Sequence, residues 1–291
     1  MNDRLEKKVL LTGATGRVGA RFIPLLRQQG AQLRLAVWNP DPAVVGPANP
    51  NLVMGDLTDP QTCRRAVEGM DAIVHIASAF MGVTAPEAED LNYRATAQLT
   101  AAAAEAGVQQ FVQMSSYLIY LPTPGRPTRE DDPLRPADKA PFSAAKLGSE
   151  RAVAAHMGSN LKISVLRVAF TYGEGDPHLV DAFAWAKRTS GDQRLHLVHH
   201  ADVRQSVLAA LQSGAVGAFN IADDTPMLAS ELSEVAQGYA SLHQESADAR
   251  ELMAAGGDDL AVEVDTNAAR TVLGFKPAFA SIWAAKEAGA M

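Results

Sequence analysis

Six short runs rich in β-branched and other apolar residues recur along the first 170 positions, and stretches with helical spacing separate them. The runs are KVLLTG, QLRLAVW, NLVMGD, DAIVHIA, QQFVQMSS and KISVLRV, which begin at positions 8, 32, 51, 71, 109 and 162. Strands that alternate with helices in this way are typical of a parallel sheet built with right-handed crossovers. The pattern therefore predicts an α/β fold with a doubly wound parallel sheet.

The alternation also predicts how the chain is divided. The clearest helix is expected over residues 89–107, where alanine is abundant and a glycine ends the pattern. After Tyr172 the elements become shorter, so we expect a first domain over residues 1–171 and a small C-terminal lobe over residues 172–291, with segments that return to the sheet. Residues 121–141 are proline-rich and are expected to form a long loop, and such loops are usually functional.

Composition narrows the range of partners. The formal net charge of −7, with lysine and arginine scattered along the chain, argues against nucleic acid as a partner. No apolar run approaches the ~20 residues that span a bilayer, and the charged start lacks the apolar core of a signal peptide. We therefore expect a cytoplasmic protein without a membrane partner. The single cysteine, Cys63, is expected to be a buried structural thiol.

A glycine-rich segment, TGATGRVG, follows the first run directly at residues 12–19. Its first glycine permits a tight turn, its second lets the backbone approach a pyrophosphate, and its third allows close packing of the following helix. The strand before it and the helix after it favour a dinucleotide-binding loop of the Rossmann type over an isolated turn. The residues expected to bind the cofactor here are Gly13, Thr15, Gly16, Arg17, Val18 and Gly19.

The end of the second run bears on the choice between NAD and NADP. An acidic residue there contacts the ribose hydroxyls of NAD, whereas a nearby arginine accommodates the 2′-phosphate of NADP. This chain has Trp38 and Asn39, which supply neither, although both are expected beside the adenosine. Two places are compatible with Trp38: packed on the adenine, or on the rim of the site. Either Arg17 or Arg34 is a candidate for contact with a 2′-phosphate. The sequence therefore leaves the cofactor open as NAD or NADP.

Further motifs, in chain order, resemble the extended or atypical short-chain dehydrogenases/reductases, in particular the NAD-dependent epimerase/dehydratase-like family. The resemblance covers nearly the whole chain. It rests on Gly55-Asp56-Leu57, His75-Ile76-Ala77-Ser78, Asn92-Tyr93, the run FVQMSS at residues 111–116, Tyr120, and the run LGFKP at residues 273–277.

The resemblance implies roles for residues at the cofactor. Asp56, with Leu57 beside it, accepts a hydrogen bond from the adenine amino group, although capping of the helix expected near Pro60 also fits Asp56. Ala77 and Ser78 line the cofactor, where the small side chain of Ala77 leaves room for a ribose. His75 is expected to be structural.

The resemblance also implies a catalytic set. In the family a serine after the fifth strand polarises the substrate oxygen, a tyrosine passes the proton, and a lysine four residues later lowers the tyrosine's pKa and holds the nicotinamide ribose. Four residues on a helix bring both side chains to one face. Ser116 matches the serine, with Tyr120 four residues later, and Lys146 matches the lysine. Phe142 stands in place of the tyrosine, and without a hydroxyl it forfeits a factor of about 10²–10⁴ in rate.

Four explanations fit Phe142. Another group carries the proton, namely Tyr117, Tyr120, Tyr172 or a water held by Lys146. The reaction is a non-redox lyase or isomerase reaction, or the chain is a cofactor-binding regulator that has lost catalysis, or Phe142 is an engineered substitution. The retained serine and lysine favour an NAD(P)-dependent oxidoreductase or epimerase, because a regulator has little need of either.

The substrate is expected beyond the carboxyl ends of the strands, between residues 79–90, 117–141 and 169–202. Family members that bind nucleotide sugars usually carry an asparagine after the sixth strand and an arginine-bearing segment that hold the diphosphate. Here Phe170 stands near the asparagine's place and Arg194 is the remaining cation. We therefore expect a small, non-nucleotide carbonyl or alcohol substrate. The expected walls are Phe80, Met81, Tyr117, Leu118, Phe170 and Trp185.

Two further expectations concern metals and assembly. His199 and His200 are adjacent, and neighbouring positions on a strand face opposite ways, so we expect no metal site. The resemblance also allows a homodimer through the helices expected over residues 89–107 and 140–158.

Overall fold

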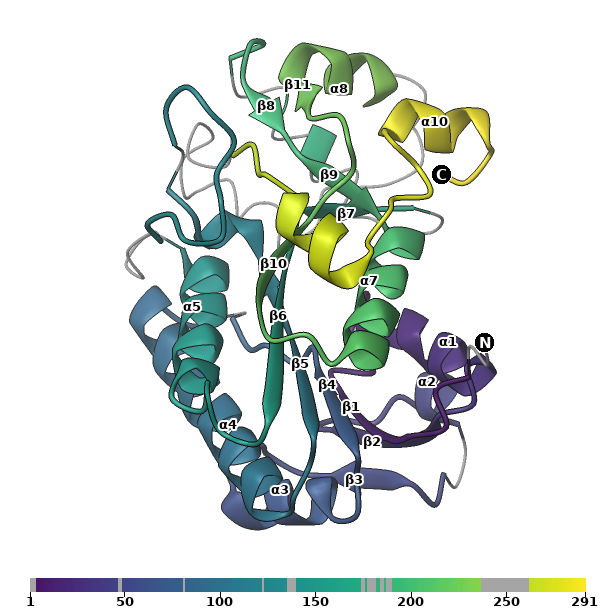
Figure 1. Ribbon diagram of the computed structural model, residues 1–291, viewed down its shortest axis with the longest axis vertical. Coiled ribbons are helices and arrows are strands. Elements are labelled where there is room, and N and C mark those ends of the chain that lie inside the picture. The colour runs from purple at the N-terminus through teal and green to yellow at the C-terminus, as the bar shows by residue number, and fades with distance from the viewer. Residues whose placement is uncertain are drawn as a thin grey trace.

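A parallel sheet of seven strands forms the centre of the computed structural model (Figure 1). The structure describes residues 4–46, 49–80, 82–121, 123–134, 140–173, 176, 182–183, 186, 190–236 and 262–291. The strand order is β10-β6-β5-β4-β1-β2-β3, and every neighbouring pair is parallel. The strands are β1 (Lys8–Thr12), β2 (Gln32–Val37), β3 (Leu52–Met54), β4 (Ala72–His75), β5 (Gln110–Ser116), β6 (Lys162–Val168) and β10 (Gly217–Ile221). The predicted doubly wound α/β fold is confirmed.

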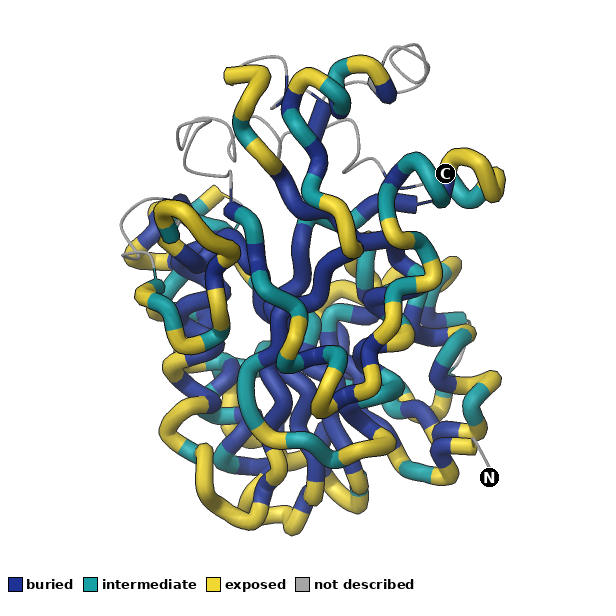
Figure 2. Tube along the Cα trace, turned by 45° about the horizontal axis from the view of Figure 1, so that its top comes forward, coloured by how far each residue is buried: buried dark blue, intermediate teal, exposed yellow. Residues whose placement is uncertain are grey.

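Helices cover both faces of the sheet, as the buried runs require. On β1, Val9 and Leu11 face one apolar cluster and Leu10 faces the other, because neighbouring side chains point to opposite sides. One face is covered by α3 (Pro60–Val67), α4 (Ala85–Glu105) and α5 (Pro141–Ala154), and the other by α1 (Phe22–Gln28) and α7 (His200–Ser213) (Figure 1). Figure 2 shows the strands as the most buried part of the molecule.

The long helix α4 begins four residues before the expected position at Glu89. Its start is fixed by a capping box, in which the Glu87 carboxylate accepts hydrogen bonds from the Thr84 amide at 2.8 Å and hydroxyl at 2.7 Å. Pro86 in the first turn is well tolerated there, because an amide in the first turn has no partner inside the helix. The start signal was present in the sequence but fell outside the alanine-rich stretch.

The C-terminal part of the chain contributes both to the sheet and to a smaller lobe at its carboxyl edge (Figure 1). β10 extends the sheet beside β6. In the lobe, β7 (Phe170–Tyr172) pairs with β9 (Leu197–His199), and β8 (Arg194–Leu195) pairs with β11 (Met227–Leu228). The C-terminal part also contains α8 (Ala229–Ala236), a π-helical turn (Ala269–Leu273) and α10 (Ile282–Glu287). Earlier in the chain lie the short helix α2 (Pro42–Val45) and a 3₁₀ turn at Tyr117–Ile119. In the described part of the chain, no helix combines the length and apolar character needed to cross a membrane.

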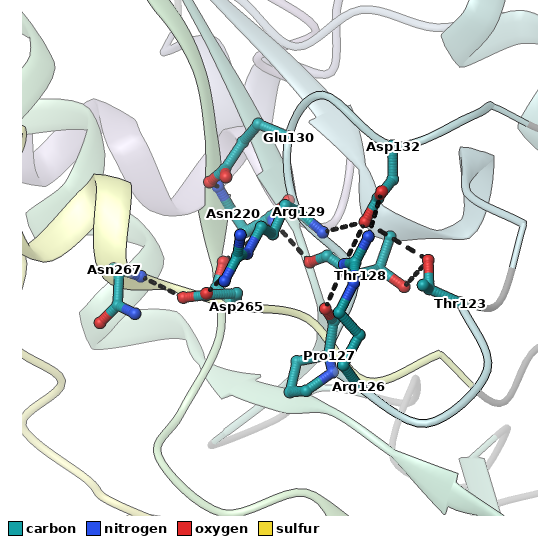
Figure 3. A network of polar contacts seen from close by, with 10 residues as sticks. All are labelled: Thr123, Arg126, Pro127, Thr128, Arg129, Glu130, Asp132, Asn220, Asp265 and Asn267. Atoms are coloured by element: carbon teal, nitrogen blue, oxygen red, sulfur yellow. Dashed lines mark hydrogen bonds and ion pairs between the residues drawn. The ribbon is translucent and has the colours of Figure 1, made fainter.

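Residues 123–134 of the proline-rich loop are tied to the C-terminal lobe by a polar network (Figure 3). The Thr128 amide donates to the Glu263 carbonyl at 2.7 Å, and the Asp265 amide donates to the Thr128 carbonyl at 2.8 Å. The Asn220 side chain, at β10, donates to the carbonyls of Thr128 and Asp265 at 3.2 and 3.0 Å. The loop that precedes α5 is therefore held by both the sheet and the lobe.

Candidate functional site

The glycine-rich loop after β1 is packed too tightly for any other residue at two positions. Gly13 has φ +70°, and a Cβ there would lie 2.6 Å from the Ala77 amide nitrogen. A Cβ on Gly19 would lie 2.0 Å from the Gly13 carbonyl oxygen. These contacts press the loop against the end of β4 and leave its backbone exposed to an approaching ligand.

The loop leads into a 3₁₀ turn at Gly19–Arg21, and the α-helix proper begins only at Phe22. The expected helix is therefore present, but its first turn is 3₁₀ rather than α-helical. Pro24 accounts for the difference, because it has no amide hydrogen to donate to the Ala20 carbonyl, which interrupts the helical hydrogen-bond ladder.

A chain of buried hydrogen bonds connects the loop to α4 and α5. The Thr12 hydroxyl oxygen accepts from the Ile76 and Ala77 amides at 3.2 and 3.3 Å and lies 2.7 Å from His75 Nδ1. His75 Nε2 lies 3.0 Å from the Thr96 hydroxyl, which donates to Ser149 at 3.2 Å. Because Thr96 donates onward, His75 donates from Nε2 and accepts at Nδ1.

Burial lowers the pKa of His75 to about 3, with a smaller contribution from the charge of Lys146. The imidazole is therefore neutral at ordinary pH, and both of its nitrogens are occupied. This arrangement agrees with the structural role expected for His75.

A cavity of about 590 Å³ opens beside the loop, at the carboxyl edge of the sheet where the strand order reverses between β1 and β4. This is the position at which open α/β sheets bind ligands. The cavity brings together most of the predicted site residues from six separate segments of the chain. These are Gly13, Thr15, Gly16, Arg17, Val18, Gly19, Trp38, Asp56, Leu57, Ala77, Ser78, Ser116, Phe142 and Lys146.

Asn39 and Tyr120 are not among the described residues that line the cavity. The contact expected between Asn39 and the adenosine stays a prediction. Trp38 lines the cavity just after β2, and Asn39 follows it in the same bend, where it is exposed. Tyr120 lies behind the site, where its hydroxyl donates to Asn220 Oδ1 and accepts from Arg167 Nη1, both at 2.7 Å. Burial also raises its pKa, so Tyr120 is excluded as the proton carrier.

Around Asp56, the structure separates alternatives that the sequence left open. The Asp56 carboxylate accepts from the Thr58 amide at 2.8 Å, whereas Asp59 caps α3 by accepting from the Gln61 and Thr62 amides. Capping of this helix by Asp56 is therefore wrong. Asp56 keeps its place on the cavity wall.

Arg34 points away from the cavity, because its guanidinium donates to carbonyls at the C-terminal end of α3, among them Glu68 at 2.7 Å. The expectation that Arg34 can reach a 2′-phosphate is therefore wrong. Arg17, in the glycine-rich loop, lines the cavity.

Ser116, Phe142 and Lys146 also line the cavity. Ser116 ends β5, and its Oγ accepts from the Leu118 amide at 3.3 Å. Lys146 projects from α5 and donates from Nζ to the Met114 carbonyl at 3.2 Å, with Nζ 5.7 Å from the centre of the Phe142 ring. The spacing of 142 and 146 thus places both on the cavity side of one helix, as predicted.

Lys146 is buried, and the nearest carboxylate on its helix is paired with another residue. Burial lowers the pKa of Lys146 to about 8, and the carboxylate of Glu150, one turn later, acts in the opposite direction. Glu150 is itself held by Arg167 on β6, with Nη2 2.7 Å and Nε 3.1 Å from its oxygens. The carboxylate closest in the helix is therefore already paired with another cation.

Of the other tyrosines that the sequence offered as proton carriers, Tyr172 is fully buried outside the cavity, and burial raises its pKa. Its ring packs edge-on against His199 with centres 5.2 Å apart. Tyr172 is therefore excluded as well. Tyr117 does line the cavity, although its side chain belongs to the apolar core.

Aromatic side chains form a wall beside the serine and lysine. The Phe80 and Phe142 rings meet edge to face, with centres 5.1 Å apart, and Phe170 and Leu118 also line the cavity. Arg194 does not line it and lies 3.6 Å from the Glu263 carboxylate at the surface. Met81 and Trp185, two other expected walls, fall outside the described residues.

Two buried hydroxyls on the cavity wall lack partners. The Oγ atoms of Ser78 and Ser115 have no hydrogen-bond partner among the described residues, and both residues line the cavity. Buried polar groups are nearly always paired, so these hydroxyls suit a polar ligand. Together with the tight glycine loop they fit a dinucleotide. Ser115 was missed in the sequence, although the Ser-Ser pair at the end of β5 was the available signal.

The adjacent histidines are engaged elsewhere. His199 Nε2 donates to the Ala290 carbonyl at 2.8 Å, and His200 pairs with the Asp176 carboxylate. Within the described ranges, no group of three or more histidine, cysteine, aspartate or glutamate side chains is arranged to hold a metal ion. Cys63 is buried, its Sγ donates to the Leu57 carbonyl, and burial raises the pKa of the thiol to about 12.

Comparison with known proteins identifies the family to which these features belong. Residues 9–222 match the NAD dependent epimerase/dehydratase family, and the chain belongs to it. The resemblance drawn from the motifs is thereby confirmed. Because the family is NAD dependent, the prediction of a nicotinamide dinucleotide cofactor is confirmed too.

The relatives cover several reactions. A dTDP-glucose 4,6-dehydratase of Streptomyces griseus is 32% identical over 181 residues, which are 57% of this chain and 54% of that protein. A 3-beta-hydroxysteroid dehydrogenase of Mycolicibacterium neoaurum is 35% identical over 124 residues, which are 39% of this chain and 33% of that protein. The chain thus matches about half or less of the length of these two enzymes.

Solved structures share the whole architecture. DesIV, a dTDP-glucose 4,6-dehydratase from Streptomyces venezuelae with NAD and TYD bound, superposes with a TM-score of 0.74 at 23% identity, covering 96% of this chain and 97% of that one. The UDP-glucose 4-epimerase of Thermus thermophilus in complex with NAD gives 0.74 at 21% identity, covering 94% of both chains. At this identity the similarity is one of fold.

Proposed function

We propose that the chain is an NAD(P)-dependent oxidoreductase that acts on an apolar alcohol or carbonyl compound without a nucleotide. The observation that supports this most directly is one cavity lined both by the glycine-rich loop and by Ser116, Lys146 and an aromatic wall. A protein that only binds the cofactor has no use for the serine and the lysine.

The cofactor would lie along residues already placed on the cavity wall. The loop at Gly13 and Gly19 would take the pyrophosphate, Trp38 and Asp56 the adenosine, and Lys146 the nicotinamide ribose. When bound, the nicotinamide supplies the position that accepts or donates a hydride. Arg17 is the residue that would meet a 2′-phosphate, so its contribution decides between NAD and NADP.

Ser116 would hold the substrate oxygen. Its Oγ already accepts a hydrogen bond from the Leu118 amide, which leaves the hydroxyl proton free to be donated to a substrate oxygen. Such a positioned donor stabilises the charge that develops on the oxygen during the reaction. Phe142 contributes no proton and instead closes the apolar wall with Phe80.

The apolar substrate class follows from the charges along the cavity. Among the described lining residues the cations are Arg17, in the glycine-rich loop, and Lys146. A substrate diphosphate would need further cations to pair with, because isolated buried charges are costly. The local similarity to 3-beta-hydroxysteroid dehydrogenase supports the same substrate class.

Phe142 favours a second candidate function, a cofactor-binding regulator that has lost catalysis. Loss of the hydroxyl that carries the proton would by itself be enough to abolish turnover. A non-redox lyase or isomerase on the same scaffold is the third. The three differ in what is measured: turnover with a change in nicotinamide absorbance, binding without turnover, or product without a change in absorbance.

The test is a substrate screen with purified protein, NAD and NADP, followed by nicotinamide absorbance and mass spectrometry of products. We expect turnover of apolar secondary alcohols or ketones and none of UDP-glucose. Ser116→Ala should lower kcat by about 10²-fold, and Phe142→Tyr should raise it, since a positioned acid or base contributes about 10²–10⁴. Ser159→Ala, at an exposed serine after α5, is the matched control. Cofactor binding without turnover, with an affinity that Ser116→Ala leaves unchanged, would instead show that the chain is a regulator.

Two larger-scale features belong to the same proposal. The lobe formed after residue 171 would cover the substrate, and residues 1–171, whose sheet is extended by β10, would bind the cofactor. Two copies would pair through α4 and α5, whose outer faces carry the exposed Tyr93 and Arg151. Sedimentation of the purified protein measures this last point.

A further inference from the structure

Replacement of the tyrosine by Phe142 leaves open which group exchanges a proton with the substrate oxygen. Among the described residues that line the cavity, five have titratable side chains, namely Arg17, Asp56, His75, Tyr117 and Lys146. Arg17 belongs to the glycine-rich loop, which is the part of the cavity assigned to the cofactor. Asp56 lies at the adenosine end and accepts from the Thr58 amide. His75 is neutral and has both nitrogens engaged.

Tyr117 and Lys146 remain. The Tyr117 side chain is fully buried in the apolar cluster between the sheet and α7. Lys146 is buried too, with 6% of the residue exposed, but it lies on the cavity wall in contact distance of the ring that replaced the tyrosine. Its Nζ has three donors, and one of them is used on the Met114 carbonyl.

The groups around Lys146 do not keep its amino group protonated at all pH values. The charged or titratable groups that interact with it are His75 on β4 and Glu150 on its own helix, and Glu150 is in turn paired with Arg167 on β6. The one carboxylate among them, Glu150, is shared with Arg167. Since burial lowers the pKa of the lysine to about 8, amine and ammonium forms are both available near neutral pH, which is what acid/base catalysis requires.

We infer that Lys146 itself exchanges the proton with the substrate oxygen, as base in the amine form and as acid in the ammonium form. This inference rests on the proposed oxidoreductase function. In oxidation, the alcohol O–H bond breaks and its proton goes to the Nζ lone pair, the C–H electron pair leaves as hydride to the oxidised nicotinamide dinucleotide, and a C=O bond forms. In reduction, the ammonium returns the proton to the new alkoxide oxygen.

The first test needs neither substrate nor turnover. The chain is labelled with ¹³C at lysine Cε, and the Cε shifts are followed by NMR from pH 6 to pH 11, with Lys146→Arg assigning the signal. The expected midpoint for Lys146 is near 8. A midpoint near 10 or above would overturn the inference, because the ammonium would then not release its proton near neutral pH.

The second test uses the loaded enzyme and the best substrate of the screen. kcat for oxidation should rise with pH to a plateau. Lys146→Arg should lower kcat by about 10²-fold or more and remove this rise while the dinucleotide still binds. Lys146→Ala should regain part of its kcat with added ethylamine. Tyr117→Phe should keep the midpoint of the pH profile whatever its effect on KM, and Lys286→Arg, at an exposed lysine of α10, is the matched control.

The outcomes separate the two levels of the proposal. Turnover that survives Lys146→Arg, or a pH profile that is lost in Tyr117→Phe, overturns the role of Lys146 and leaves the oxidoreductase intact. Absence of turnover in the parent protein with bound dinucleotide overturns both.

Discussion

Replacement of His75 by glutamine tests the buried hydrogen-bond chain that joins the glycine-rich loop to α4 and α5. The imidazole connects Thr12 to Thr96 and is almost fully buried, at 1% exposure. The pKa of His75 falls from its usual 6.5 to about 3, first because of burial and then because of the positive charge of Lys146. Acid should therefore destabilise the fold through this residue.

The sign and size follow from proton linkage. The folded chain binds the His75 proton less readily than the unfolded chain does, so the stabilisation is complete above pH 6.5 and is lost as the pH falls toward 3. At ~1.4 kcal/mol for each pH unit, the interval from 6.5 to about 3 corresponds to ~5 kcal/mol. Of this, ~2 kcal/mol should be lost between pH 7.5 and pH 5.

The measurement is urea unfolding, followed by circular dichroism, at pH 7.5, 6 and 5 for the parent and His75→Gln. At pH 7.5 the variant should be less stable by about 1–3 kcal/mol, because glutamine cannot satisfy both threonines. At pH 5 this gap should shrink by ~2 kcal/mol, since the variant has no proton to take up at this position. The remaining histidines affect both proteins equally. A gap that stays constant from pH 7.5 to pH 5 would refute the reasoning.

Three other changes have defined outcomes. Gly19→Ala places a Cβ 2.0 Å from the Gly13 carbonyl oxygen and should weaken dinucleotide binding by about 10-fold or more in a calorimetric titration. Burial and neighbouring carboxylates raise the pKa of Asp223, so stability should fall as pH rises above about 4, and Asp223→Asn should flatten the melting temperature between pH 5 and pH 8. Glu150→Ala leaves Arg167 buried without a counter-ion and should cost about 3–5 kcal/mol in urea unfolding, whereas an unchanged midpoint would contradict the buried ion pair.

The sheet and the glycine-rich loop were predictable because their signals are local. Runs such as that at Val9 to Leu11 are apolar at every position, which a strand buried on both faces requires. The tight turn at Gly13 needs a positive φ, and glycine adopts this readily. The four-residue spacing of Phe142 and Lys146 is helical, so their shared face could be read directly from the sequence.

Other features depend on directions that spacing does not encode. Tyr120 follows Ser116 by four residues, but a 3₁₀ turn intervenes and sends its hydroxyl to Asn220, 100 positions away. Arg34 and Trp38 lie close in sequence, yet one points to the end of α3 and the other to the cavity. The unpartnered hydroxyl of Ser115 is visible only once the neighbouring strands and α5 are in place.

The most direct test of the account is a titration of the purified chain with NADH and with NADPH, followed by tryptophan fluorescence and calorimetry. Trp38 lines the cavity and is 66% exposed, so it lies within reach of a bound dinucleotide. The account predicts saturable binding of one cofactor, with Kd on the order of 1 µM. It also predicts energy transfer to the nicotinamide that falls in Trp38→Phe more than in Trp283→Phe. Absence of binding of either cofactor to the folded protein would contradict the account.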